Sequence, residues 1–254
     1  MALREQIAKT YDKVLEEKNY KLSELRKTTK DKTKIDEMQS IINEMIKNRE
    51  ARINKTLAGY TDLRPKPGAG RTTDGFLPVP GAANLSVSYT PVTNGEYAAF
   101  IRAVGRKAPS DWTNGIYPDG RVNYPVTNVS YNDAVAYCMW LSKKDRSAKY
   151  RLPTESEWEQ AAGHMPKDAE FNAGEKKGIT PVNNYSKTLS ASGAVNMWGN
   201  VWEWTSTTRK NGTKAVKGGA WNSKRTDCRT ENRNEGRNPK YGRNNIGFRV
   251  FREK

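Results

Sequence analysis

Residues 218–251 read GGAWNSKRTDCRTENRNEGRNPKYGRNNIGFRVF, and the interpretation of the whole chain starts from them. This stretch ends on Ile246 to Phe251, whose alternating apolar residues are typical of a strand. Between Trp221 and Ile246 aliphatic residues are almost absent, so this part cannot form a core of its own. We therefore predict a long surface segment held at both ends. A binding role is favoured over a merely solvated loop, because long irregular segments inside compact domains are usually functional.

The chain has 254 residues and a formal net charge of +16, which is large for one domain. The excess lies in residues 205–254, which hold fourteen Lys or Arg against four acids. Such a charge attracts nucleic acid, an anionic membrane face or an acidic cell-surface polymer. Nucleic acid is the disfavoured partner, because the sequence shows no recognised nucleic-acid motif and no regular interleaving of aromatic and basic residues.

The few cysteines and the single histidine limit which metal and redox sites the chain can form. Cys138 and Cys228 are too far apart for a CxxC unit, and the single histidine, His164, cannot supply a site that needs several imidazoles. No apolar run approaches the roughly 18 residues of a membrane span. We expect no secretory signal peptide, because the first residues lead directly into an amphipathic pattern. The expected location is a virion or phage particle or the cytoplasm, with cell-surface display as an alternative.

The chain divides into three parts by composition. Apolar residues at three- and four-residue spacing within residues 1–57 predict a helical hairpin or coiled-coil segment. Its apolar stripes must be buried against each other, against the globular part, or against a second copy in a homo-oligomer. Residues 58–84 are rich in Gly and Pro and predict a linker. Residues 85–254 then form the main domain.

Within residues 85–254 short helices and strands are separated by long loops. Thr154 and Glu157 have the spacing of a capping box and predict a short helix that runs to Ala162. Cys138 falls on an apolar helix face and is expected to be buried. The tryptophans at 198, 202 and 204 carry too much apolar area to stay in solvent, so we expect them in the core.

Six motifs in this part point to one family. They are Thr90–Tyr97, Pro125–Leu141, Arg151–Glu159, Gly199–Trp204, Lys217–Trp221 and Gly247–Val250. In this order they resemble the formylglycine-generating-enzyme (sulfatase-modifying factor) family over roughly residues 85–252. The resemblance implies an α+β, C-type lectin-like fold of the formylglycine-generating-enzyme type. Such a fold has little regular structure, a small twisted antiparallel core and long ordered loops.

The same resemblance bears on catalysis. The family's enzymes use two cysteines in the final stretch to bind copper and activate oxygen, and here one falls on Cys228 but the other on Ser223. A serine hydroxyl is a poor substitute for the soft thiolate that copper(I) prefers. We therefore expect no enzyme, no catalytic residue and no cofactor, and keep a formylglycine-generating-type oxidase acting on a protein cysteine as the alternative. In the enzymes the Gly199–Trp204 motif supplies calcium ligands, so calcium at Asn200 and Glu203 is a minor alternative to a hydrogen-bonded turn.

Residues 221–249 have a second resemblance. They are similar to the variable region of the variable proteins of diversity-generating retroelements, in which an error-prone reverse transcriptase mutates template adenines. Asn codons then scatter to residues such as Ser, Thr, Asp, Gly and Tyr, while a structural frame stays constant. The resemblance places in that frame Trp221, Cys228, Arg229, Arg233, Ile246 and Phe248.

The remaining positions would vary and contact a ligand. They are Asn222, Ser223, Lys224, Asp227, Thr230, Asn232, Asn234, Gly236, Asn238, Tyr241, Gly242, Asn244 and Asn245. Lys224 and the nearby Glu231, Glu235 and Lys240 depart from the pattern, since they need a different template codon. The resemblance implies a non-enzymatic receptor-binding protein of a phage, a virus or a prophage-bearing cell. Its hypervariable segment would bind a macromolecule on a target cell, and the positive charge favours an anionic one.

Overall fold

The computed structural model describes residues 2–53, 75–174 and 178–254. The chain divides into two compact units, Met1–Leu63 and Arg64–Lys254. Most of the predicted linker, residues 58–74 of 58–84, lies outside the described residues. Among the residues that are described, no helix combines the length and the apolar character that crossing a bilayer requires.

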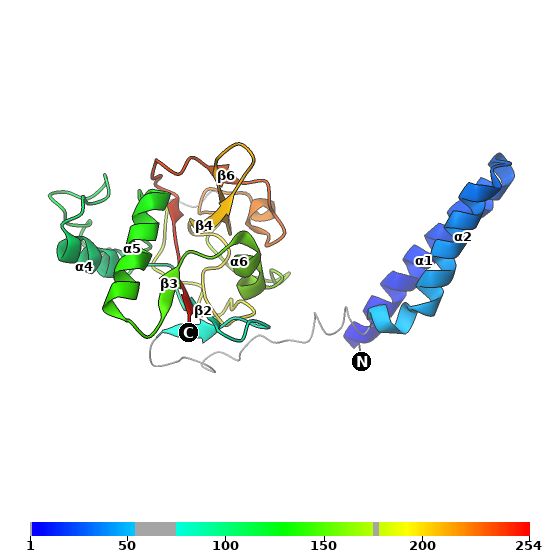
Figure 1. Cartoon of the computed structure of the whole chain (residues 1–254), viewed down its shortest axis with the longest axis horizontal. Coiled ribbons are helices and arrows are strands. Elements are labelled where there is room, and N and C mark those ends of the chain that lie inside the picture. Colours follow the sequence, from blue (N-terminus) through cyan, green and yellow to red (C-terminus); the bar gives the residue numbers. More distant parts are fainter. Residues whose placement is uncertain (1, 54–74, 175–177) are drawn as a thin grey trace. The chain divides into compact units, whose positions relative to one another are not determined.

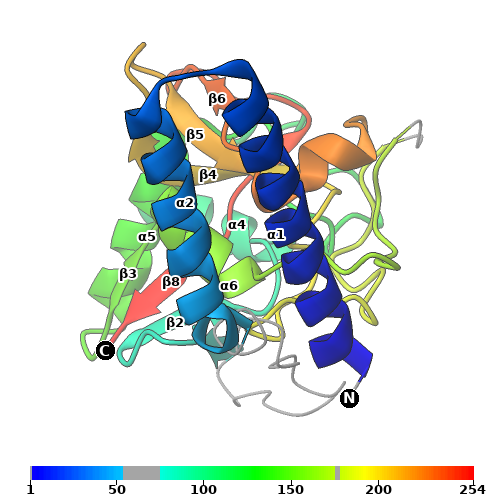
Figure 2. The ribbon, with the colours of Figure 1, turned by 90° about the vertical axis from the view of Figure 1, so that its right-hand side faces the viewer.

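The first unit is an antiparallel pair of helices, α1 (Ala2–Thr28) and α2 (Lys32–Lys47). Figure 2 shows the two helices side by side, joined by a tight turn at one end. The Tyr11 hydroxyl donates to the Met45 carbonyl oxygen at 2.9 Å, so the start of α1 lies against the end of α2. The Asp31 side chain caps the start of α2, so that only residues 29–31 separate the two helices.

The described residues of the globular unit form two four-stranded sheets. The first sheet has the order β1-β2-β8-β3 and all its pairs are antiparallel. The second has the order β6-β5-β4-β7, in which β4 and β7 run parallel. The strands of the first sheet are β1 (Phe76–Pro78), β2 (Leu85–Ser88), β8 (Phe251–Glu253) and β3 (Lys149–Arg151). The strands of the second are β6 (Gly236–Arg237), β5 (Lys214–Lys217), β4 (Trp202–Thr208) and β7 (Ile246–Gly247).

Two details of the sheets differ from the sequence prediction. Strand β1 lies inside the stretch predicted as linker, because Leu77 and Val79 are buried and β1 pairs with β2. The globular unit therefore begins at Phe76 or before, rather than at residue 85. The single closing strand predicted over residues 246–251 is split: β7 belongs to the second sheet and β8 to the first.

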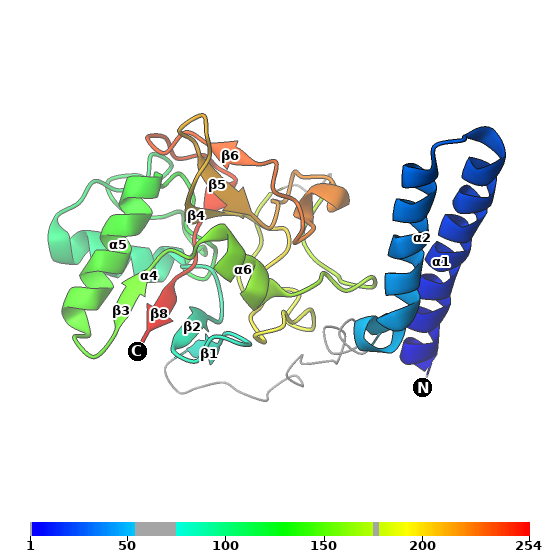
Figure 3. The same cartoon turned by 45° about the vertical axis from the view of Figure 1, so that its right-hand side comes forward.

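Three helices cover the sheets, and each starts with a capping box in which the N-cap side chain and the third helical residue satisfy each other's backbone amides. The capping box predicted at Thr154 and Glu157 is confirmed. Figures 1 and 3 show α5 and α6 on opposite sides of β3 and β8. The helices are α4 (Asn94–Val104), α5 (Tyr131–Lys144) and α6 (Glu155–Ala162).

The core lies around the sheets and is rich in aromatic rings. Trp198, Trp202 and Trp204 are buried, as predicted. Tyr97 of α4 stacks on Tyr137 of α5, with ring centroids 5.9 Å apart. This rigid interior holds the long loops, including the segment before β7, at defined positions.

Candidate ligand-binding surface

Residues 222–245 form the predicted surface segment, and Figure 1 shows them as the orange-to-red part of the chain around β6. A short 3₁₀ helix, η1 (Arg225–Cys228), and β6 are its only regular elements. Its two ends meet: the Asn245 side-chain amide donates to the Asn222 side-chain oxygen at 3.1 Å. Its flanks are fixed to the core, since the Trp202 amide donates to the Asn245 carbonyl at 2.9 Å.

Lys217 holds the middle of the segment. This β5 lysine is fully buried, and its ammonium donates to the Thr230 carbonyl at 2.7 Å and to the Asn232 carbonyl. Its countercharge is Glu159 of α6, with Nζ and Oε1 2.9 Å apart. A buried ammonium is tolerated only when it is paired and hydrogen-bonded, and here it is both. This residue was not predicted from the sequence, although a lysine directly after the apolar residues Ala215 and Val216 was the available signal.

Two predicted ligand contacts are instead part of the interior. The Thr230 hydroxyl accepts from the Trp198 indole at 3.0 Å and donates to the Gly163 carbonyl at 2.6 Å. The Ser223 hydroxyl accepts from the Ala220 amide at 3.0 Å. Thr230 is 6% exposed and Ser223 is 8% exposed, so neither can reach a ligand. The prediction was wrong at both positions, because codon scatter carries no information about burial.

Gly242 and Gly236 also cannot be replaced freely by residues with a side chain. A Cβ on Gly242 would lie 2.3 Å from the carbonyl oxygen of Asn128, and one on Gly236 would lie 2.5 Å from the Thr213 hydroxyl. At Gly242 the obstacle is backbone, which cannot swing away as a flexible side chain can. These glycines therefore belong to the frame rather than to the contact surface.

The remaining predicted contacts differ in exposure. Asp227, Asn232 and Asn245 are half-buried. The exposed positions lie mainly in the two stretches that the Asn222–Asn245 contact joins. They are Asn222, Lys224, Asn234, Asn238, Tyr241 and Asn244.

The stretch from 238 to 244 lies over the start of α5. The Tyr131 amide donates to the Pro239 carbonyl at 3.2 Å, and the Asn128 amide donates to the Arg243 carbonyl at 2.9 Å. Backbone contacts therefore hold this stretch, so its exposed side chains, unlike the position of Gly242, are free to differ. Tyr241 is 63% exposed and is the largest apolar group that the segment presents.

The predicted frame residues fall into three groups. Cys228, Ile246 and Phe248 are fully buried, and Trp221 is half-buried against the core. Arg233 is exposed but bound to Glu159, with Nε and Oε1 2.8 Å apart. Arg229 differs from the prediction: it is exposed, and among the described residues its side chain forms no hydrogen bond or ion pair.

The two positions of the enzymes' cysteine pair do not fit a copper ion. Burial, with the nearby Asp227 carboxylate, raises the pKa of the Cys228 thiol to about 12, so the thiolate is scarce at neutral pH. The Ser223 hydroxyl is already bound to a backbone amide. One buried thiol and one hydroxyl are not the soft donor pair that copper(I) requires. Within the described ranges, no three His, Cys, Asp or Glu side chains are grouped as a metal site.

Asn200 and Glu203 belong to two separate buried networks. The Asn200 side-chain oxygen accepts from the Thr180 amide at 2.8 Å, and its amide donates to the Thr180 carbonyl at 3.0 Å. The Glu203 carboxylate accepts from the Trp158 indole at 2.6 Å and from Arg249 at 2.7 and 2.8 Å. A calcium ion would have to displace these donors, so the geometry favours the hydrogen-bonded turn over calcium.

A family model of the sulfatase-modifying factor enzyme 1-like domain matches residues 81–254 of this chain. The chain belongs to the sulfatase-modifying factor family. The globular unit has the family's α+β, C-type lectin-like fold, with its N-terminal helices as a separate unit.

Three comparisons show what the chain is similar to. The formylglycine-generating enzyme of Mus musculus is 35% identical over 127 residues, which cover 38% of this chain and 32% of that protein. The inactive C-alpha-formylglycine-generating enzyme 2 of Bos taurus is 30% identical over 161 residues, 51% of this chain and 50% of that protein. The structure of Treponema denticola variable protein 1 superposes with a TM-score of 0.54 at 20% identity, covering 67% of this chain and 84% of that one. The matches thus span half or less of the length of these two curated relatives, one of which is described as inactive.

Proposed function

We propose that this chain is a non-enzymatic ligand-binding protein, whose ligand is contacted by exposed positions between Asn222 and Asn245. The observation that carries the proposal is the contrast within the segment. Its backbone is held by buried groups outside it, such as Lys217, while six of the side chains predicted to contact the ligand are exposed. A binding surface that tolerates many sequences needs this separation between a fixed frame and free side chains.

The charge and composition of the segment support an anionic macromolecular ligand on a target cell. Residues 221–245 contain seven Lys or Arg and three acids. Seven basic against three acidic side chains leave these residues with a net charge of +4, so the field of the segment is positive. The proposal includes diversification by a retroelement, as in the variable proteins that the segment resembles. It also includes self-association through α1 and α2 and a place on a virion or phage particle.

An oxidase acting on a protein cysteine is the second candidate, because active enzymes are among the relatives. It would need a second thiolate beside Cys228, and the residue at that position is the buried Ser223. Cys138, the other cysteine, lies buried in α5. These observations favour the binding protein, which needs no catalytic residue and no cofactor.

The deciding experiment is to sequence the DNA around the gene. We expect a near-copy of the segment encoding residues 221–249, differing where the copy has adenine, beside a reverse transcriptase gene. Across natural variants the codons for Asn238, Tyr241 and Asn244 should differ, whereas Thr230 and Gly242 should be constant. A locus with neither a copy nor a reverse transcriptase would remove the diversification claim. Copper binding and oxygen uptake by the parent protein, lost in Cys228→Ser, would then establish the oxidase.

A further inference from the structure

The end of α5 and the turn that follows it carry four exposed cations within seven residues, Lys143, Lys144, Arg146 and Lys149. We call these four residues the α5-end cluster. In Figures 1 and 3 the turn from α5 into β3 lies at one end of the globular unit, whereas β6 lies at the other. The cluster is therefore separate from the surface segment around β6 that was considered above.

The acid inside the cluster is occupied by the turn itself. The Asp145 carboxylate accepts from the Ser147 amide at 3.0 Å, from the Ser147 hydroxyl at 2.6 Å and from the Tyr150 hydroxyl at 2.6 Å. Hydrogen bonds from Ser147 and Tyr150 lower the pKa of Asp145 to about 2, so this carboxylate is charged at neutral pH. Its oxygens bind the turn rather than a member of the cluster.

Glu253 is the other acid in contact with the cluster. Its carboxylate accepts from Arg151 Nε at 2.6 Å, and Lys149 Nζ lies 3.7 Å from its second oxygen. The contact with Lys149 is weak, because the lysine side chain stays 72% exposed and exposed ion pairs contribute little. Lys149 therefore remains accessible to a partner outside the chain.

The other three cations have no acidic partner among the described residues. The side chains of Lys143 and Arg146 form no hydrogen bond or ion pair with any of these residues, and Lys144 lies over the Trp140 ring, 5.4 Å from its centroid. Lys143 and Lys144 lie in the last turn of α5, where a cation stabilises the carbonyl end of a helix. Arg146 and Lys149 lie beyond the helix, so helix stabilisation does not account for them.

Apolar side chains border the cluster on α5. Met139 is 57% exposed and lies four residues before Lys143, on the same helix face. Trp140 is half-buried beneath the Lys144 ammonium. Lysines beside an exposed apolar group are typical of surfaces that lie at the boundary between lipid headgroups and acyl chains. A DNA duplex would also attract the cations, but it would leave Met139 in water.

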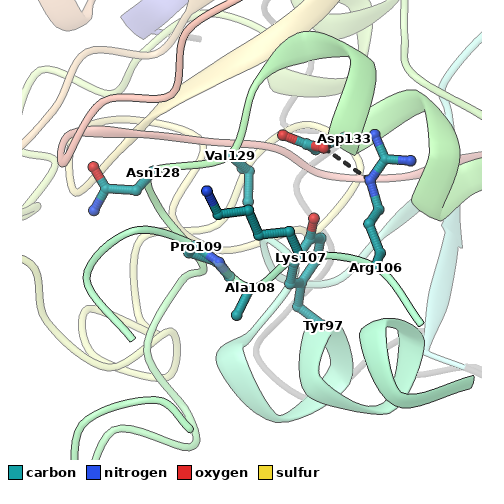
Figure 4. Close-up of a pocket in the computed structure, with 8 residues that line it drawn as sticks. All are labelled: Tyr97, Arg106, Lys107, Ala108, Pro109, Asn128, Val129 and Asp133. Carbon is teal, nitrogen blue, oxygen red and sulfur yellow. Dashed lines mark hydrogen bonds and ion pairs between the residues drawn. The ribbon is translucent and has the colours of Figure 1, made fainter. Parts of the chain in front are cut away.

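The start of α5 has no such excess of charge. Figure 4 shows Arg106 directed at Asp133, and the two form an ion pair with Nε and Oδ1 2.9 Å apart. Asp133 and Lys144 are eleven positions apart on α5, which corresponds to roughly 16 Å. This distance exceeds the Debye length of about 8 Å at physiological salt. The charges at the two ends of α5 therefore act separately.

We propose that the α5-end cluster docks the globular unit on an anionic lipid surface, with Met139 at the boundary between headgroups and acyl chains. Clusters of roughly four to eight Lys or Arg on an amphipathic helix bind anionic lipids, and each cation near such a surface strengthens binding roughly fivefold. Since β6 lies at the other end of the globular unit, the surface segment around it then faces away from the lipid. That orientation suits the proposed function and rests on it, whereas lipid binding does not.

The test is co-sedimentation of the full chain with phosphatidylcholine vesicles, with and without phosphatidylserine, at low and at high salt. We expect binding that requires phosphatidylserine and decreases as the salt concentration rises. Lys143→Gln combined with Arg146→Gln should weaken this binding on the order of twentyfold, the product of two fivefold effects. Met139→Gln should weaken it severalfold without changing its salt dependence, because an apolar contact and no charge is lost.

The matched control is Lys107→Gln combined with Lys210→Gln, which removes the same charge from two exposed lysines outside the cluster. This control should bind the vesicles as the parent does. Equal binding by the cluster variant and the control, equal binding to vesicles with and without phosphatidylserine, or no binding to either would overturn the proposal.

A DNA duplex is the competing probe. Tighter binding to the duplex than to phosphatidylserine vesicles, lost in the cluster variant, would overturn the lipid assignment in favour of nucleic acid. None of these results depends on the DNA sequence around the gene, so lipid docking and diversification by a retroelement can fail separately.

Discussion

The Glu203–Arg249 pair is the interaction whose removal we expect to cost most, and Glu203→Gln is the change that tests it. Glu203 is 1% exposed and Arg249 is fully buried, so water cannot replace the hydrogen bonds that either side chain would lose. Glutamine has nearly the same shape as glutamate, so the substitution removes charge without opening a cavity.

The expected magnitude follows from the contacts. Both carboxylate oxygens of Glu203 are acceptors here: one serves the Trp158 indole and Arg249 Nε, and the other serves Arg249 Nη2. The amide of glutamine keeps one oxygen and turns its NH₂ toward at least one of these donors. The Arg249 guanidinium then stays buried without a countercharge. Removal of one partner of a buried ion pair costs about 3–5 kcal/mol.

The assay is thermal unfolding of the full chain, with and without calcium. A loss of about 3–5 kcal/mol corresponds to a decrease in Tm of roughly 6–20 °C for a domain of this size. The control is Glu235→Gln, which breaks a pair with Arg237 whose side chains are 30% and 28% exposed. That change should cost no more than about 1 kcal/mol.

Two results would refute this reasoning. Glu203→Gln could melt together with the Glu235→Gln control, which would mean that the buried pair is not needed. Alternatively, a chelator could lower the Tm of the parent protein and leave Glu203→Gln unaffected. That outcome would return Glu203 to the role of a calcium ligand.

The other predictions concern the segment and the cysteines. Gly242→Ala should destabilise the protein by about 1–3 kcal/mol in denaturant titrations, because the Cβ of the new alanine would meet the backbone of Asn128. Asn244→Ala should leave the stability unchanged. Equal unfolding midpoints for the two variants would contradict the close contact at Gly242. Cys138 and Cys228 should resist thiol reagents at pH 8 until the protein unfolds, since burial raises the pKa of each thiol to about 12. Rapid labelling of the native protein would instead favour the alternative function as an oxidase. Burial raises the pKa of Glu159, but hydrogen bonds from Arg233 and Lys217 lower it below 4.5 overall. Its stabilising effect is therefore present above pH 4.5 and lost as the pH falls through the lower folded-state value. Acid unfolding of Glu159→Gln should be less steep in this window, and an unchanged pH profile would contradict the assignment.

Local signals in the sequence predicted much of the fold correctly. The capping box at Thr154 depends on residues three apart, and the burial of three tryptophans depends on their own apolar area. The split of the closing strand could not be predicted in this way. Residues 246–251 alternate as one strand would, and only the partners of β7 and β8 show that they belong to different sheets.

The candidate surface was predicted less completely than the fold. The residue types that mutated Asn codons produce identified the segment. They cannot distinguish a serine exposed to solvent from a serine whose hydroxyl binds a backbone amide, as that of Ser223 does. The burial of Lys217 and of Arg249 was not predicted, because charged side chains are seldom buried unless paired. Their partners, Glu159 and Glu203, are distant in sequence, so the pairing is visible only in three dimensions.

The attachment of Thr230 to Lys217, Trp198 and Gly163 has a consequence for how the protein can evolve. It divides one long span into two shorter spans, 222–229 and 231–245, each anchored at both ends. Substitutions away from the contacts between the spans should then combine almost independently in their effects on affinity, whereas Asn222 and Asn245, which are hydrogen-bonded to each other, should be coupled. Short anchored spans also lose less conformational entropy when a ligand binds than one long free loop would. Away from these contacts, a favourable substitution in one span should keep its effect on affinity when the other span changes.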